Sequence, residues 1–127
     1  MQERQLYEYA VIRVMPRVER EEFLNVGVVL YCSSKKYLEA VYELNPERLS
    51  AFCSSCDAHE IEAYLIAFKN ICMGKGDAGP ISLLPGAARF RWLTATRSTV
   101  VQTSKTHPGL CADPADMLKK LFKDLVE

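Results

Sequence analysis

One continuous stretch of the sequence contains cations but no carboxylates. No Asp or Glu occurs among residues 78–112, so this segment has a formal charge of +4 and the remainder of the chain totals −4. The cations of the segment are Arg89, Arg91, Arg97 and Lys105. Guanidinium groups present paired donors that suit phosphate and carboxylate. The segment therefore predicts a surface for an anionic ligand, nucleic acid or an acidic protein partner.

Two further positions extend this candidate binding site. Gln102 lies in the same segment, whereas Arg13 lies on an earlier predicted strand whose neighbour carries Asn25 and Gly27, which we expect on one face of that strand. If the faces of those two strands coincide, Arg13 meets an amide and a gap left by the glycine. Stacking on a tyrosine is the alternative for Arg13.

The arginines of the segment could instead have structural roles that involve no ligand. Arg89 and Arg91 alternate with Phe90 and Trp92. They fit the solvated face of a strand whose aromatic residues are buried. Pairing between the segment and the acidic first half of the chain is a further alternative.

The sequence signal for a catalytic site is weaker than the signal for an anion-binding surface. His107 could act as a general base and Ser98 or Ser104 as a nucleophile, but no third group is placed by spacing. Arg13 and Arg97 would then stabilise charge on a phosphorylated substrate. A two-metal phosphotransfer site needs several carboxylates, and the segment best suited to phosphate has none.

The five cysteines do not form a recognisable metal or disulfide pattern. Cys53 and Cys56 make a lone C-x-x-C, without the second ligand pair of a structural zinc site or the βαβ setting of thioredoxin-like proteins. We expect free, partly buried thiols there, and no metal or cofactor.

The composition is that of an ordinary globular domain. The chain has 127 residues, 16 Lys plus Arg against 16 Asp plus Glu, 49% hydrophobic and 25% charged residues. These values predict one domain over residues 1–127 and argue against a generally basic nucleic-acid coat. The longest apolar run, Val26 to Cys32, is too short to span a membrane, and the polar amino terminus leads into no signal region. We expect a cytoplasmic protein.

The hydrophobic periodicity predicts five strands and three helices. The expected strands are Tyr7–Met15, Phe23–Cys32, Tyr37–Leu44, Arg89–Leu93 and Ser98–Ser104. The expected helices begin at the caps Asn45, Asp57 and Asp113. A Gly/Pro-rich loop over residues 73–86, with one short extended piece at Ile81–Leu84, separates the two halves. The order β-β-β-α-α-β-β-α predicts an α+β fold, with a mainly antiparallel sheet and helices on one face.

Several segments together are similar to a known family. They are Tyr9–Arg13, Glu22–Leu30, Arg89–Leu93, Arg97–Ser104 and His107-Pro108-Gly109 with the following Asp-Pro helix start. In this combination the chain resembles, over essentially its whole length, the small bacterial proteins grouped as domain-of-unknown-function family 3037. The resemblance implies no reaction, cofactor or catalytic residue. It implies an association with a HipA-like serine/threonine kinase.

Two functional hypotheses follow. The first is a non-enzymatic accessory or binding module whose arginines engage an anionic group, with that kinase as the partner that the resemblance implies. The second is a small hydrolase or transferase that acts on a phosphorylated substrate.

Overall fold

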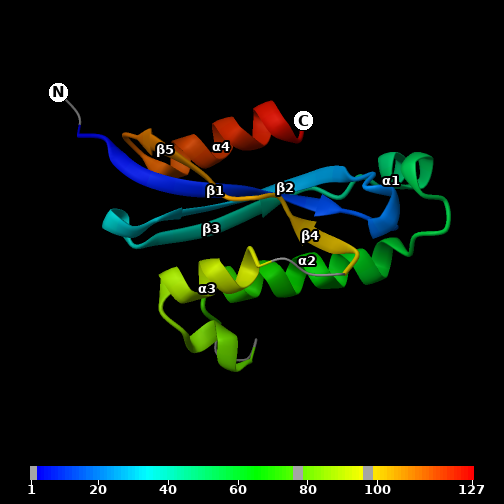
Figure 1. Cartoon of the computed structure of the whole chain (residues 1–127), viewed down its shortest axis with the longest axis horizontal. Coiled ribbons are helices and arrows are strands. Elements are labelled where there is room, and N and C mark those ends of the chain that lie inside the picture. Colours follow the sequence, from blue (N-terminus) through cyan, green and yellow to red (C-terminus); the bar gives the residue numbers. More distant parts are fainter. Residues whose placement is uncertain (1–2, 76–78, 96–98) are drawn as a thin grey trace.

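The computed structural model describes residues 3–75, 79–95 and 99–127. Within them the chain forms five strands and four α-helices (Figure 1). The strands are β1 (Gln5–Val14), β2 (Leu24–Cys32), β3 (Tyr37–Tyr42), β4 (Val101–Thr103) and β5 (His107–Cys111). The helices are α1 (Pro46–Phe52), α2 (Ala58–Cys72), α3 (Gly86–Leu93) and α4 (Pro114–Leu125). Short 3₁₀ helices cover Val18–Arg20, Ser33–Lys35 and Pro80–Leu83.

The strands form one antiparallel sheet around β1. β2 pairs with one edge of β1, and β3 pairs with β2. The other edge of β1 is shared, because β4 pairs with its last residues and β5 with its first. The predicted α+β class, single domain and antiparallel five-stranded sheet are confirmed by this arrangement.

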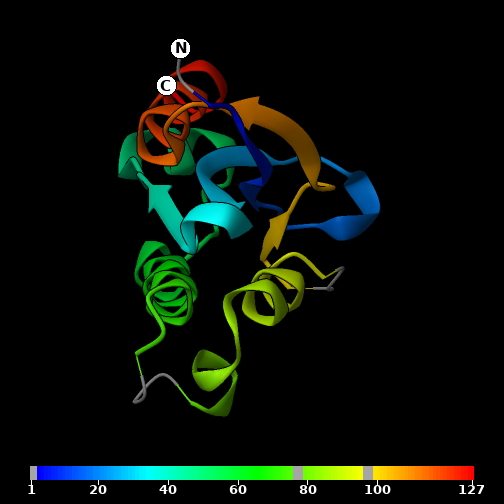
Figure 2. The same cartoon turned by 90° about the vertical axis from the view of Figure 1, so that its left-hand side faces the viewer.

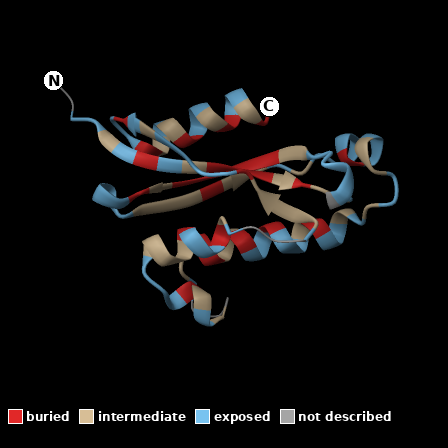
Figure 3. Cartoon of the chain, viewed as in Figure 1, coloured by how far each residue is buried: buried red, intermediate tan, exposed pale blue. Residues whose placement is uncertain are grey.

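Helices cover both faces of the sheet, so the prediction of helices on one face was wrong. α2 and α3 lie against one face and α4 against the other (Figures 1 and 2). Two buried clusters correspond to these layers, one including Ile12 and Leu65 and the other including Leu30 and Phe122. Buried segments lie along the strands and along the helices of both layers (Figure 3). The reason is that β1 and β2 carry apolar residues on both faces. A strand that is apolar on both faces has to be packed against other elements on both sides.

The three predicted helix caps are confirmed. The carboxylate of Asp57 accepts from the backbone N–H groups of His59 and Glu60, and Asn45 and Asp113 cap α1 and α4 in the same way. Each cap satisfies backbone donors that have no partner inside the helix.

The segment Arg89–Leu93, predicted as a strand, belongs to helix α3 instead. Over five residues, alternation of arginine with aromatic side chains fits either structure. Two buried positions three residues apart, Phe90 and Leu93, form the helical face, and the Phe90 ring packs on Tyr31 with 5.5 Å between centroids. The alanines at 87 and 88, which favour helix, lie upstream of this window.

The second half of the chain differs from prediction in three further places. Ile81–Leu84 was expected to be extended, but Pro80–Leu83 is a 3₁₀ helix. The strand expected at Ser98–Ser104 is reduced to Val101–Thr103, with residues 96–98 outside the described ranges. β5 was not predicted, because its sequence HPGLC lacks β-branched residues. Its proline is tolerated because β5 is paired only with β1.

Candidate functional site

Three of the sequence-predicted binding residues meet on neighbouring strands. Arg13 of β1 lies opposite Asn25 of β2 on one side and opposite Gln102 of β4 on the other. Residues opposite each other in an antiparallel pair share a face of the sheet. The three residues are therefore brought together, and we call them the Arg13 cluster.

A β-bulge places Asn25 beside Arg13. The register of β1 and β2 shifts between Ile12, which pairs with Gly27, and Arg13, which pairs with Asn25. One residue of β2, Val26, is left over, and the expectation that Asn25 and Gly27 share a face is wrong for this reason. Gly27 opens no gap beside Arg13. It is instead packed against β3, where Val41 and Tyr42 leave no room for a Cβ atom.

The guanidinium of Arg13 stacks on an aromatic ring but has an unmatched donor. Its Cζ atom lies 3.9 Å from the centroid of the Phe23 ring, so the aromatic partner is Phe23 and not a tyrosine. Its Nε atom is buried and has no hydrogen-bond partner among the described residues. Burial lowers the pKa of Arg13 from its ordinary value, because desolvation disfavours the charged form.

The two amides of the cluster are partly engaged. Asn25 Nδ2 donates to the carbonyl of Leu125 in α4 at 3.1 Å, and Gln102 Nε2 donates to the carbonyl of Thr99 at 2.8 Å. Asn25 Oδ1 is buried and finds no donor in the described part of the chain. The Arg13 cluster thus holds one free donor and one free acceptor in a half-buried setting.

Arg89 and Arg91 do not share a surface. They are two residues apart on a helix, so their side chains leave it in different directions. Arg89 donates to the carbonyls of Leu84, Ile71 and Cys72 at 2.9, 3.0 and 2.7 Å, whereas Arg91 is exposed. Arg97, like Ser98, lies outside the described residues.

The candidate nucleophile Ser104 is used by the backbone. Its hydroxyl accepts from the N–H of Val11 at 2.8 Å and donates to the carbonyl of Lys105 at 2.9 Å. This contact lies where the chain passes from β4 to β5 along the edge of β1. His107 is exposed at the start of β5, and its ring lies against Tyr9 with 5.3 Å between centroids.

Replacing Ser104 tests this structural role. We expect Ser104→Ala to lower the free energy of unfolding by about 1–3 kcal/mol, because the buried N–H of Val11 loses its partner. The exposed Thr106→Ala serves as the control and is expected to change stability by less than about 0.5 kcal/mol. Urea denaturation of both variants measures the difference, and equal stability would contradict the assignment.

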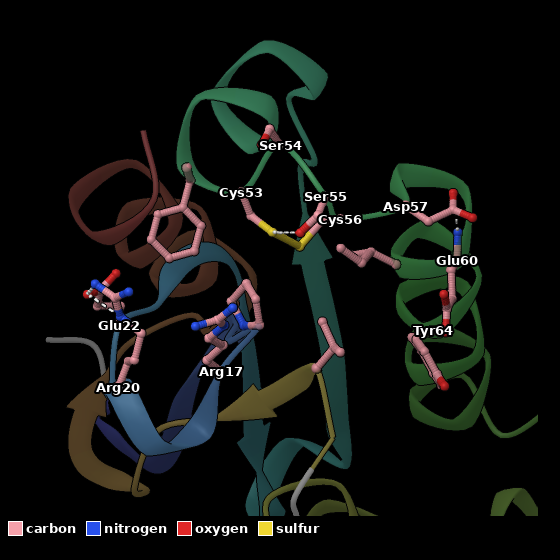
Figure 4. Close-up of a pocket in the computed structure, with 14 residues that line it drawn as sticks. Arg17, Arg20, Glu22, Cys53, Ser54, Ser55, Cys56, Asp57, Glu60 and Tyr64 are labelled. Carbon is pink, nitrogen blue, oxygen red and sulfur yellow. Dashed lines mark hydrogen bonds and ion pairs between the residues drawn. A yellow bond between two sulfur atoms is a disulfide. The ribbon is translucent and has the colours of Figure 1, made fainter.

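A pocket that the sequence did not predict has none of the Arg13 cluster residues in its lining. It has a volume of about 590 Å³, and its walls come from the segment after β1, the α1–α2 junction, the start of α2 and the residue before β4 (Figure 4). Arg17 and Arg20 lie on one side, and Asp57 and Glu60 on the other. In the sequence, residues 17–22 are only a charged connector between two predicted strands, and no spacing rule links them to a helix that begins forty residues later.

Cys53 and Cys56 line this pocket and are joined by a disulfide. The expectation of free thiols at these positions is corrected by this bond. Cys32, Cys72 and Cys111 are free and buried, and burial raises the pKa of Cys72 to about 12. Within the described ranges, no three His, Cys, Asp or Glu side chains gather closely enough to hold a metal ion.

Comparison with known proteins adds one finding. A family model described as "Protein of unknown function (DUF3037)" matches residues 9–126. Neither the curated proteins nor the solved structures provide a match. Among the described helices, none combines the length and the apolar character that a membrane span requires.

Proposed function

Because this chain belongs to the DUF3037 family, a family of unknown function, its own structure must supply a function, and we propose that it is a small binding module for anionic groups. The proposed site is the Arg13 cluster. The observation that carries the proposal is the half-buried guanidinium of Arg13, with a buried Nε that has no partner among the described residues.

The proposal rests first on the electrostatics of Arg13. A partly desolvated charge is costly unless an opposite charge or hydrogen bonds compensate for it. In the described part of the chain the only ion pair joins Arg20 to Glu22, so no carboxylate neutralises Arg13 there. An anion bound to the accessible part of this half-buried guanidinium would supply the missing charge.

The neighbours of Arg13 make the site more specific than a point charge. The Phe23 ring holds the guanidinium plane from one side and is itself 40% exposed. Planar guanidinium groups bind phosphate and carboxylate with two parallel hydrogen bonds. A phosphate ester, such as a nucleotide, matches these features.

Titration with AMP and with a single-stranded oligonucleotide tests the proposal. We expect Arg13→Gln to weaken binding about tenfold, because it removes a charged hydrogen bond. Arg91→Gln is the matched control, since it removes an equal charge from an exposed position on α3, and it should leave affinity within about twofold. For the oligonucleotide, affinity should also fall as salt rises.

Two results would overturn the proposal. One is the same affinity for every ligand in wild type and Arg13→Gln, and the other is no binding by the wild-type protein.

A HipA-like kinase, implied by the resemblance of the chain to its family, is proposed as a protein partner with an acidic surface. A pull-down of such a kinase with the same two variants distinguishes a protein partner from a nucleotide. The hydrolase or transferase alternative is less favoured, because the hydroxyl of Ser104 is already engaged at both its donor and its acceptor.

A further inference from the structure

The disulfide between Cys53 and Cys56 lies in a charged pocket, separate from the Arg13 cluster residues. From this arrangement we propose that the pocket is a thiol–disulfide exchange site for a small zwitterionic thiol, of the size and charge of glutathione. The proposal does not depend on anion binding at Arg13. It concerns a second site with its own chemistry.

Access to the sulfur atoms is the first requirement for exchange. Both cysteines line the pocket and are only partly buried. By contrast, Cys32, Cys72 and Cys111 are buried free thiols. An incoming thiolate can therefore approach the Cys53–Cys56 bond from solvent, but it cannot reach the other three sulfur atoms without opening the fold.

The surroundings distinguish the two sulfur atoms. The side chain of Cys56 packs against the apolar cluster that includes Leu65 of α2, whereas Cys53 is not part of that cluster. Cys53 is therefore the less covered of the two sulfur atoms on the pocket side, and access depends on which sulfur an incoming thiolate can reach. We expect attack at Cys53, with Cys56 as the leaving group.

The charges on the two sides of the disulfide define the class of thiol. Arg17 and Arg20 face Asp57 and Glu60 across the pocket, with the disulfide between them (Figure 4). Arg20 is paired with Glu22 at 2.7 Å, but the described residues offer no ion-pair partner for Arg17. A carboxylate of the ligand can bind Arg17, and an ammonium group can bind the acidic side. The volume of about 590 Å³ suits a tripeptide-sized molecule.

The exchange reaction balances without any other reactant. The thiolate of the small thiol attacks Cys53 Sγ, a new disulfide forms between the two, and the Cys53–Cys56 bond breaks. Cys56 departs as a thiolate with the electron pair of that bond. A second small thiol can then attack the mixed disulfide, which releases the oxidised dimer of the small thiol and leaves Cys53 as a thiolate. The protein disulfide is thereby reduced, and two small thiols are oxidised.

Rates of exchange with two thiols test the selectivity of the pocket. Glutathione and the uncharged 2-mercaptoethanol are compared at equal thiolate concentration, by alkylation and mass spectrometry of the quenched protein. In the wild type we expect glutathione to react faster, with its adduct on Cys53. In the double variant Arg17→Gln/Glu60→Gln this preference should fall about fivefold, because exposed ion pairs contribute modestly.

Three controls make the outcome decisive. Arg91→Gln should keep the wild-type preference, since Arg91 is exposed on α3 and does not line the pocket. Cys56→Ser should retain one glutathione on Cys53 after exposure to oxidised glutathione, because no second thiol is available to displace it. Thermal unfolding shows whether each variant is folded. Absence of any adduct, or a preference unchanged in the double variant, would overturn the proposal.

Discussion

Gly27→Ala is expected to lower the free energy of unfolding by at least about 3 kcal/mol. A Cβ atom at this position would lie 2.5 Å from the carbonyl oxygen of Val41 and 2.8 Å from Cβ of Tyr42. Gly27 pairs with Ile12 on one side and Tyr42 on the other, in the middle of the sheet. The clash is with an adjacent strand and not with the end of a flexible side chain, so relief requires β2 and β3 to separate.

Gly86→Ala provides a matched control for this substitution. Its Cβ would be 3.4 Å from the ring of Tyr31, and Gly86 begins helix α3, where alanine is favourable. We expect a change of less than about 1 kcal/mol, in the stabilising direction. Urea denaturation of both variants measures the contrast. A similar small effect in both proteins would mean that β2 and β3 separate easily enough to accommodate a methyl group.

Arg89→Met is expected to cost about 2–4 kcal/mol of folding free energy. The guanidinium donates to two carbonyls at the C-terminal end of α2 and to a third, that of Leu84, before α3. The carbonyl of Cys72 has no partner within α2, whereas that of Ile71 also accepts from the N–H of Gly74 at 3.1 Å. A cation at this end of α2 also interacts favourably with the helix dipole. Methionine keeps much of the length of the side chain but removes all three hydrogen bonds.

Arg91→Met separates the loss of these bonds from the loss of charge. Arg91 is exposed on the same helix, so its replacement should change stability by less than about 0.5 kcal/mol. Thermal and urea denaturation measure both variants, and hydrogen exchange should show faster opening of α3 in Arg89→Met alone. Equal effects of the two substitutions would contradict a stabilising role for the Arg89 hydrogen bonds. Any loss of ligand binding in an Arg89 variant must also be separated from this loss of stability.

Short-range signals in the sequence predicted most of the first half of the fold. β1, β2 and β3 are recognised by β-branched and aromatic runs, and the helix starts by side chains that cap their own backbone. These signals involve residues that are close in sequence, so they survive without knowledge of the tertiary structure. The prediction of a strand at RFRWL was wrong because five residues cannot distinguish a period of 2 from one of 3.6. β5 was not predicted because its strand conformation depends on pairing with β1 and on the fit of Gly109 against Tyr7.

The sequence predicted which residue types could bind an anion better than it predicted which residues those side chains contact. The proximity of Arg13 and Asn25 follows from neighbouring strands, although a bulge was needed to align them. The segregation of charge, by contrast, suggested one surface for Arg89 and Arg91. In the structure, Arg89 instead donates to main-chain carbonyls that no sequence pattern marks.

The sequence by itself determined the α+β class, the three central strands, the helix caps and the residue types able to bind an anion. Those properties depend on local propensity and hydrophobic periodicity. Only the tertiary structure decided that helices cover both faces, that Arg13 meets Gln102, and that Arg17 faces Glu60 across a disulfide. Each of these depends on contacts between segments far apart in the chain. Net charge and spacing describe the order of residues along the chain, and only folding determines which of them are neighbours in space.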